Sequence, residues 1–344
     1  MIFLICVIPF IIPFLMKLKY KNEITWPELA ISCTISCLIA IIVYNSSLYA
    51  EMIDVQVLSS QVNSKERKVV SCEHDYKCHC TTHTTYSNGK TTTSTKCQTC
   101  YEHSYDVSWI VKSNIENFKI SRIDRQGLIE PPRYTKAYIG EPVAITNSYT
   151  NYVKGAKNSL FNMNQYKDLS NLPEYPSHIY DYYKINRVID LTGKVNTEPY
   201  NIAIAEMLKV LGSSKQVNVV LVFDKEYQNS LKLKAKFLGG KKNDIVVVVG
   251  GEDLNWVNVF SWSKNEMLNV KLKDDLMALG ALNSKNFIEV VETNIKMHYV
   301  RREMKEFEYL KDSIEPSTNM VILALVLSII TSIGLSIWSV KNEL

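Results

Sequence analysis

Cysteine and histidine side chains, which can ligate metal ions or form cross-links, gather in one short segment of the chain. Five of the eight cysteines and four of the six histidines lie within residues 72–103. At the centre stands Asn88-Gly89, the strongest short signal for a hairpin because both turn positions favour a positive φ. Threonine, serine and tyrosine flank it, and these residue types favour exposed strands. The segment therefore predicts a two-stranded hairpin.

The position of the turn determines which cysteines face each other. With a two-residue turn at its centre, the numbers of paired positions sum to 177, so Cys80 faces Cys97. Side chains alternate between the two faces of a strand, which places Cys78 on the same face. We expect Cys100 to reach that face only if the chain is distorted after Cys97.

Two chemistries fit these residues, and the sequence leaves both open. Thiolates from two short segments can form a structural zinc ribbon, in which another nearby side chain can replace one ligand. The four thiolates are Cys78, Cys80, Cys97 and Cys100, and the alternates are Cys72, His74 and His103, the last two of which face each other in the predicted register. The alternative is disulfide bonds, which an oxidising compartment favours. Either chemistry would fasten a hairpin too polar to be stable alone.

Three carboxylates form a second candidate site. Asp190 and Asp224 end two predicted strands, and Asp253 follows a third. Ligand sites of open α/β sheets lie at the carboxyl ends of strands, so these side chains can bind a divalent cation and support metal-dependent hydrolysis. The alternative is that they cap turns and helices. The sequence has no phosphate loop, no G-x-S-x-G turn and no H-E-x-x-H motif, so we assign no catalytic residue.

From about residue 185 the chain alternates between apolar strands and amphipathic helices. Strands are predicted at residues 185–191, 217–223, 245–249 and 256–262. Helical segments are predicted at residues 200–212, 225–240, 274–282 and 286–310. Because the β-branched runs are continuous, we expect a sheet that helices cover on both faces.

The blocks that carry this pattern resemble the TPM domain family; they are VIDLTGKV, VNVVLVFDK and FLGGKKNDIVVVVG. The resemblance covers residues 185–300 and implies an α/β/α sandwich in a membrane-anchored extracytoplasmic protein. It also implies a role in maintaining or modulating membrane complexes, with phosphatase activity in some relatives. One difference is that Phe260-Ser261-Trp262 stands where the family usually has a glycine-aromatic-glycine turn. The whole layout is similar to uncharacterised membrane proteins of tailed bacteriophages.

Three segments carry almost no charge. Trp26–Tyr44 and Met320–Val340 have 19 and 21 residues, close to the ~20 residues that a helix needs to cross a bilayer. Met1–Met16 is shorter and contains Pro9 and Pro13, so a short retained span, an interfacial helix and a cleaved signal peptide all remain open. The sequence predicts a membrane protein with three apolar segments.

Basic residues in the short connector set the orientation. Residues 17–25 contain Lys17, Lys19 and Lys21 against a single acidic residue, so this connector is predicted to be cytoplasmic. The second span then leaves the cytoplasm, and the last one returns. Residues 45–318 are therefore predicted to lie on the extracytoplasmic or periplasmic side of the inner membrane.

The expected fold is an α+β membrane protein with four parts. Residues 1–44 form two membrane segments, and residues 45–184 form the Cys/His hairpin, a small β module and a connector. Residues 185–315 form the TPM-like domain, and residues 319–340 form the last membrane helix. Strands are expected at 104–113 and 118–124 within the second part, because apolar and polar residues alternate there. In the second span, Ser32, Ser36 and Cys37 form a small-residue face that can pack against another helix.

Charge narrows the classes of function. The chain has a net charge of +4, and four of the 39 basic and three of the 35 acidic residues lie outside residues 45–318, which leaves that part at +3. A balance this close to zero argues against nucleic-acid binding. The spans contain no Lys, Arg, His or Asp, so no ion pathway is expected. We favour a membrane-anchored extracytoplasmic interaction or scaffold protein without enzymatic activity. Its expected partners are the lipid bilayer and a membrane or periplasmic protein. The alternative is a phosphatase-like metal-dependent hydrolase, and no cofactor besides structural zinc is expected.

Overall fold

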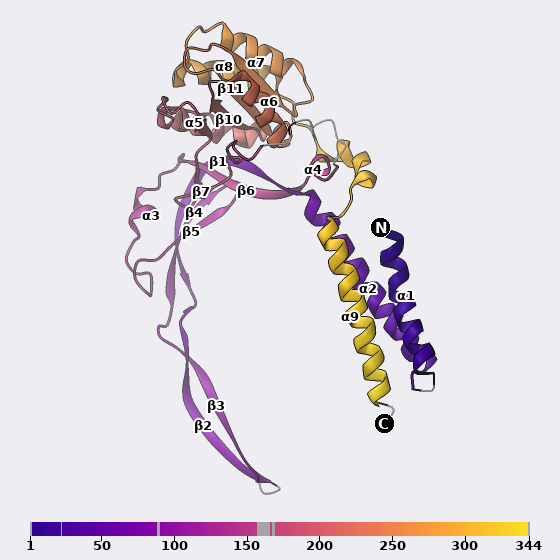
Figure 1. Cartoon of the computed structure of the whole chain (residues 1–344). Helices are drawn as coiled ribbons and strands as arrows, with labels where there is room; N and C mark the ends of the chain where they lie inside the picture. Colours follow the sequence, from indigo (N-terminus) through magenta and orange to yellow (C-terminus); the bar gives the residue numbers. More distant parts are fainter. Residues whose placement is uncertain (1, 22, 88–89, 157–165, 167–168, 343–344) are drawn as a thin grey trace.

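The computed structural model describes residues 2–21, 23–87, 90–156, 166 and 169–342. The elements form three parts, which Figure 1 shows in one view: a head built around two sheets, a bundle of long helices, and a long two-stranded ribbon that extends away from the head. The fold is mixed α+β, as predicted.

The long helices come from the two ends of the chain and lie side by side (Figure 1). They are α1 (Ile2–Lys19), α2 (Trp26–Met52) and α9 (Thr318–Asn342). Among the described residues, two helical segments are long and apolar enough to cross a membrane by length and composition, Trp26–Met52 and Thr318–Lys341. Helix α2 starts where the sequence predicts, because Thr25 and Glu28 form a capping box there. It continues beyond residue 44, since nothing in the next residues breaks a helix.

A serine contact joins α2 to α9. Ser32 and Ser36 are buried in the bundle, whereas Cys37 is half-buried. The Ser332 hydroxyl donates a hydrogen bond to the Ser328 carbonyl at 2.8 Å, so the Ser36 hydroxyl is the donor in its 2.8 Å contact with Ser332. Small side chains at this face let the two helices approach closely, as the small-residue pattern predicts.

The first sheet of the head is antiparallel, with strand order β5-β4-β1-β6. Its strands are β1 (Ile53–Val70), β4 (Asp106–Ser113), β5 (Asn117–Ile120) and β6 (Pro142–Thr150). The predicted strands at 104–113 and 118–124 correspond to β4 and β5. Strand β1, which the sequence analysis did not predict, follows α2 directly and is 18 residues long. Its first half pairs with β6 and its second half with β4.

The second sheet has strand order β12-β11-β10-β9, with only β12 antiparallel to its neighbour. Its strands are β9 (Val188–Asp190), β10 (Asn218–Phe223), β11 (Asp244–Val249) and β12 (Val257–Ser261), and its helices are α5 (Glu198–Lys215), α6 (Tyr227–Lys236), α7 (Met267–Met277) and α8 (Ser284–His298). Leu221 packs with α5, α7 and α8, whereas the next residue, Val222, packs with α6 on the opposite face. Helices therefore cover both faces, as the continuous apolar runs predict.

The helical stretch predicted at residues 286–310 is divided. Helix α8 ends at His298, and a 3-10 helix, η1 (Met304–Ser313), follows after a short extended segment. In this segment the Val300 carbonyl accepts a hydrogen bond from the Lys264 amide at 2.9 Å, and the Val300 amide donates to the Ser263 hydroxyl at 3.1 Å. These tertiary bonds compete with a continuous helix. Helix α7 also lies earlier in the sequence than the predicted residues 274–282.

The remaining elements are short. They are α3 (Pro132–Lys136), α4 (Tyr152–Gly155), β7 (Ile179–Tyr180) and β8 (Lys184–Ile185). Strands β7 and β8 pair with each other, and β8 leads into β9 and thereby into the second sheet. The Ala144 amide of β6 donates a hydrogen bond to the Tyr183 carbonyl at 2.9 Å, which attaches the segment around β7 and β8 to the first sheet.

Polar bonds and close packing join the two sheets. A Cβ atom at Gly212 of α5 would lie 2.6 Å from the Ser59 Cβ of β1, so only glycine allows this approach. The buried guanidinium of Arg187 donates to the Ser59 hydroxyl at 2.6 Å and to the Asn218 side-chain oxygen at 2.8 Å. Burial lowers the pKa of Arg187 to about 10, which keeps it charged at neutral pH. The two sheets therefore form one head.

Candidate functional site

The ribbon in Figure 1 is the predicted hairpin, formed by β2 (Asp75–Ser87) and β3 (Lys90–Tyr101). Ser87 pairs with Lys90 and Thr81 pairs with Lys96, which confirms the predicted register for this half of the hairpin. The predicted turn at Asn88-Gly89 lies outside the described residues.

Two disulfide bonds cross the hairpin, so of the two alternatives for these cysteines the structure contains the cross-links. Cys80 is bonded to Cys97, as facing positions allow, and Cys78 is bonded to Cys100. The Cα atoms of the Cys78–Cys100 pair lie 5.8 Å apart, within the usual range for a disulfide. Zinc binding by these four cysteines would require both bonds to be reduced, because zinc is held by thiolates.

A bulge in β2 brings Cys78 and Cys100 together. The register shifts between Cys78 and Thr81, where two residues of β2 oppose one of β3, and His79 adopts a left-handed φ of 45°. The prediction that Cys100 needs a distortion after Cys97 is therefore wrong. The extra residue lies in the other strand, and it moves the sulfur of Cys78 towards that of Cys100.

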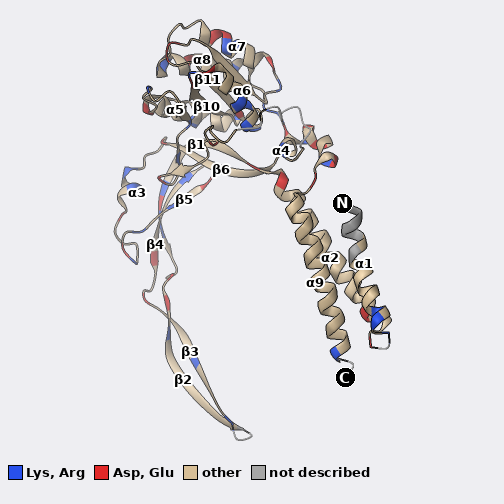
Figure 2. Ribbon diagram, in the orientation of Figure 1, with Lys and Arg blue, Asp and Glu red and all other residues tan. Residues whose placement is uncertain are grey.

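The hairpin contributes nothing to the core of the head. Among the described residues, β2 and β3 form a sheet with each other only. Of the twelve residues of β3, all are exposed except the half-buried Cys97 and Cys100. Figure 2 shows that the ribbon is largely uncharged, and its four charged residues are Asp75, Lys77, Lys90 and Lys96. Cross-strand threonine contacts, such as Thr82 to Thr95 at 3.4 Å, add only weak side-chain interactions.

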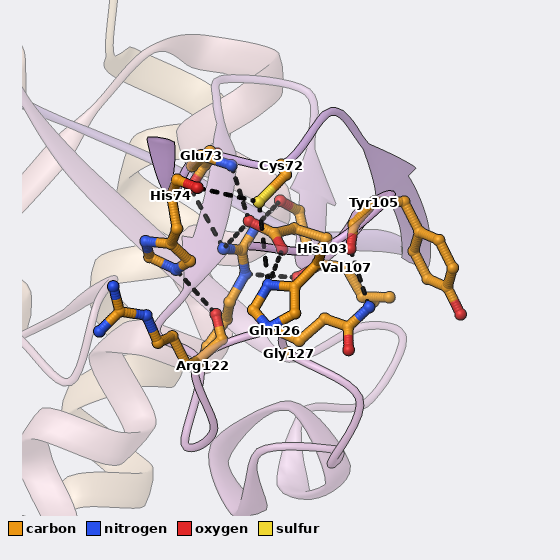
Figure 3. A network of polar contacts seen from close by, with 12 residues as sticks. Cys72, Glu73, His74, His103, Tyr105, Val107, Arg122, Gln126 and Gly127 are labelled. Atoms are coloured by element: carbon orange, nitrogen blue, oxygen red, sulfur yellow. Dashed lines mark hydrogen bonds and ion pairs between the residues drawn. The ribbon is translucent and has the colours of Figure 1, made fainter. Parts of the chain in front are cut away.

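A second group of ligand-type side chains lies where the hairpin joins the head (Figure 3). Cys72 comes from the link between β1 and β2, His103 from the link between β3 and β4, and Asp106 from the first position of β4. The Cys72 sulfur lies 3.8 Å from His103 Nδ1, and His103 Nδ1 lies 3.3 Å from Asp106 Oδ1. The three ligand atoms all lie within 4.8 Å of one another, with Cys72 and Asp106 buried and His103 half-buried. We call this group the junction cluster.

Fixed donors orient the Asp106 carboxylate. Its Oδ2 accepts hydrogen bonds from the Glu73 amide at 2.8 Å and from Arg122 Nη1 at 3.1 Å. The bond from Glu73, together with the charge of Arg122, lowers the pKa of Asp106 below its ordinary value. Its Oδ1 is buried, has no hydrogen-bond partner among the described residues, and lies 3.3 Å from His103 Nδ1, with which it pairs when the ring is protonated. The carboxylate therefore directs this oxygen, which accepts no hydrogen bond from a described residue, into the junction cluster.

The loop after β5 holds Arg122 in place. The Arg122 Nε donates to the Val107 carbonyl at 2.5 Å, and the Trp109 indole donates to the Gly127 carbonyl at 2.9 Å. Gly127 has a φ of 82°, and a Cβ atom there would lie 2.3 Å from the Val107 oxygen. Glycine is required at this position, since any side chain would push the loop away from the sheet.

His74 lies beside the junction cluster without joining it. Its Nε2 donates to the Arg125 carbonyl at 2.9 Å, because a carbonyl oxygen can only accept. The rings of His74 and His103 lie edge to face with their centroids 6.2 Å apart. The predicted pairing of His74 with His103 is wrong by one position, since the Glu102 amide donates a hydrogen bond to the His74 carbonyl. The bulge in β2 accounts for this shift.

The candidate ligands are therefore distributed differently from the predicted arrangement. The hairpin cysteines are paired with each other, whereas the alternates Cys72 and His103 meet Asp106, which the sequence analysis did not select. The spacing His103-x-x-Asp106 is the only local signal for it. A second geometric group, Cys78 with His79 and Cys100, has both of its sulfurs in a disulfide.

The three strand-end carboxylates do not form a common ligand cluster in the structure. Asp190 accepts hydrogen bonds from the Thr192 and Val195 amides at 2.8 and 3.0 Å, and so closes a turn. Asp224 accepts from the Glu226 amide at 2.9 Å through Oδ1, and its Oδ2 is buried without a hydrogen-bond partner among the described residues. Asp253 is exposed. Two of the three thus have the local roles expected of turn and helix caps.

A cavity of about 570 Å³ lies between β6, β8 and α5. One of its charged groups, Glu141, accepts from the Tyr183 hydroxyl at 2.7 Å and pairs with Arg133 at 3.0 Å. Arg187 is held by the two sheets. Among the described residues, no group of three metal-ligand side chains lies in this cavity, in contrast to the junction cluster.

No protein-family model, curated protein or solved structure matches this chain. Its function therefore has to be inferred from its own residues and their geometry.

Proposed function

We propose that the protein is a membrane-anchored extracytoplasmic interaction or scaffold protein whose hairpin binds a membrane or periplasmic partner. In this proposal α2 and α9 cross the inner membrane. Both helices meet the head at one end of the bundle, and Figure 2 shows basic residues at the other end, where the last turn of α1 contains Lys17 and Lys19 and that of α9 contains Lys341. Basic residues favour the cytoplasmic side, which supports an extracytoplasmic head. Disulfides persist in an oxidising compartment, which supports the same side.

The observation that carries the proposal is the hairpin itself. Two disulfide bonds fasten a ribbon that buries no core and that no other described element covers. An isolated two-stranded hairpin is at best marginally stable in water. The two cross-links stabilise the ribbon and not the head. We therefore infer that the ribbon itself makes contacts with another molecule.

The direction in which the hairpin extends restricts the places where a partner can bind it. In Figure 1 the ribbon extends from the head towards the same side as α2 and α9. Its threonine, serine and lysine side chains and its unpaired strand edges cannot face lipid hydrocarbon. Residues 71–74 and 102–105 join it to the head without belonging to a regular strand. We therefore expect the ribbon to bend at this junction and to meet its partner in water above the bilayer.

Site-specific photo-crosslinking in intact cells tests the proposal. A photoreactive residue at Thr84 in the hairpin should yield a discrete adduct, and one at Met297, which is 63 % exposed on the head, should not. The Thr84 adduct should disappear when Cys80 and Cys97 are both replaced by serine. Absence of a Thr84 adduct, or the same adduct from Met297, would argue against a binding role for the hairpin.

A second candidate function is supported by one observation, the unpartnered Asp224 oxygen at the carboxyl end of β10. A divalent cation there would make the TPM-like part a phosphatase-like hydrolase, with Asp224 as the one strand-end carboxylate among the described residues that keeps an unpartnered buried oxygen. The full chain can be incubated with phosphoesters and divalent ions. The scaffold proposal predicts no turnover, whereas activity that Asp224→Asn abolishes and Lys225→Met leaves unchanged would favour the hydrolase.

A further inference from the structure

The geometry points to a zinc site at the junction cluster, with Cys72, His103 and Asp106 as ligands. This site differs from a zinc ribbon made by the hairpin cysteines, and it does not depend on which side of a membrane the head occupies. Sulfur, imidazole nitrogen and carboxylate oxygen are the ligand types that zinc takes in proteins.

The separations of the ligand atoms suit one central ion. Ligands at ~2.0–2.3 Å from a tetrahedral zinc ion lie roughly 3.3–3.8 Å from each other. The Cys72 sulfur and His103 Nδ1 are 3.8 Å apart, and His103 Nδ1 and Asp106 Oδ1 are 3.3 Å apart. Both contacts use the same nitrogen of His103. A catalytic triad needs the two different ring nitrogens, so this geometry suits a shared metal ion and not a nucleophile with its base.

Two further observations point to a ligand. Cys72 is the one free thiol among the five cysteines of residues 72–103, because the disulfides consume the other four. Asp106 is fully buried, and its Oδ1 lacks a hydrogen-bond partner among the described residues. A buried carboxylate oxygen without a partner is costly. A zinc ion would compensate it directly.

Neighbouring groups orient the ligands. Glu73 and Arg122 occupy the other oxygen of Asp106, which fixes the carboxylate with Oδ1 towards His103. Such supporting bonds around a ligand are typical of protein metal sites. Three protein ligands leave one tetrahedral position, which a water molecule would fill.

The site would join the two chain segments that connect the hairpin to the head. Cys72 precedes β2, whereas His103 and Asp106 follow β3. A bound ion would therefore hold both ends of the ribbon together at the point where it leaves the head, in addition to the two disulfides farther along.

Metal analysis of the full chain tests the site. The chain is purified in detergent through a tag without histidine, with Cys6, Cys33 and Cys37 replaced by serine so that Cys72 is the only free thiol. After dialysis against zinc we expect one zinc ion per chain. We also expect Cys72 to react with a thiol reagent about 10-fold faster once a chelator removes the metal, since a bound thiolate is protected.

Substitutions distinguish this site from the other candidates. Cys72→Ser, His103→Gln and Asp106→Asn should each lower zinc affinity by more than about 100-fold, because each removes a direct ligand. His79→Gln, which alters the other geometric group, should retain one zinc ion. Circular dichroism and intact disulfides confirm that each variant is folded. In protein incubated with cobalt, the thiolate-to-metal absorption band should be present in the wild type and in His79→Gln and absent in Cys72→Ser. A wild-type chain without zinc, or zinc lost in His79→Gln and kept in Asp106→Asn, would overturn the proposal.

Discussion

The hairpin and the second sheet of the head contain strands that are stabilised in opposite ways. Every residue of β10 and β11 is buried, and helices cover both faces. In β3 no residue is buried. The second sheet is stable because apolar side chains leave water, at ~1.5–3 kcal/mol for each large one. The hairpin lacks this contribution, so cross-links and backbone hydrogen bonds must hold it.

This difference indicates that the two regions respond to different perturbations. A packed core is sensitive to the loss of volume, and a cross-linked ribbon is sensitive to reduction.

Phe287 is fully buried in the core that α8 shares with the second sheet. Phe287→Ala should lower the free energy of unfolding by about 3–5 kcal/mol, because it leaves a cavity. Thr84→Ala in the hairpin should change it by less than about 0.5 kcal/mol. Urea unfolding of the full chain in detergent measures both. Equal effects would mean that the hairpin is packed against the head in solution.

Replacing Cys80 and Cys97 together by serine opens a cross-link that closes a loop of 17 residues in the sequence. We expect the hairpin to lose about 3 kcal/mol of local stability, while β10 is unaffected. Hydrogen exchange of the amides in β2, β3 and β10 reports the two regions separately. Cys33→Ser in α2 serves as the control. Faster exchange in β10, or unchanged exchange in β2 and β3, would contradict the separation of the two regions.

The ion pair between Asp54 and Lys241 joins the two sheets at 2.5 Å, with both side chains largely buried. Lys241→Met should cost about 2 kcal/mol, because the Asp54 carboxylate stays buried and keeps its bonds from Asn151 and Tyr149. Lys225→Met, at an exposed position, should be neutral. Thermal unfolding distinguishes the two variants, and an equal loss in both would indicate a general effect of charge.

Acid should change the stability of the junction cluster and that of the second sheet in opposite directions. The pKa of Asp106 is lowered, so its contribution is complete above its unfolded pKa of ~3.9 and is lost as pH falls through the folded pKa. Burial raises the pKa of Asp244 in the second sheet, so stability there declines as pH rises from ~3.9 towards the folded value. Protection factors, which correct for the intrinsic slowing of amide exchange in acid, should therefore fall near the junction cluster first as pH is lowered from 6 to 3. Asp106→Asn should remove that response, and an unchanged acid response in this variant would contradict the assignment.

The sequence predicted the hairpin and the second sheet well for different reasons. The position of the turn dipeptide determines which residues of the two strands pair, and the predicted pairs from Ser87–Lys90 to Thr81–Lys96 are correct. The runs at 217–223 and 245–249 are recognisable because buried parallel strands are continuously apolar. In contrast, the bulge at His79 depends on how two disulfides share one ribbon, which pairing rules alone do not determine.

Other features depend on contacts between distant parts of the chain. Strand β1 was not predicted, since its two halves pair with two different strands and its first residue follows α2 without a break. Asp106 meets Cys72 only after β1 and β4 pair, and 33 residues separate them in the sequence. The serine contact between α2 and α9 was partly predictable, because small residues at helical spacing indicate a packing face without naming the partner helix.

The orientation of the head is tested most directly by alkaline phosphatase fusions in bacterial cells, since this enzyme is active only outside the cytoplasm. A fusion after Ser313, between the head and α9, is predicted to be active, and a fusion after Leu344 is predicted to be inactive. An inactive fusion after Ser313 together with an active one after Leu344 would place the hairpin and its disulfides in the cytoplasm and contradict the proposed function.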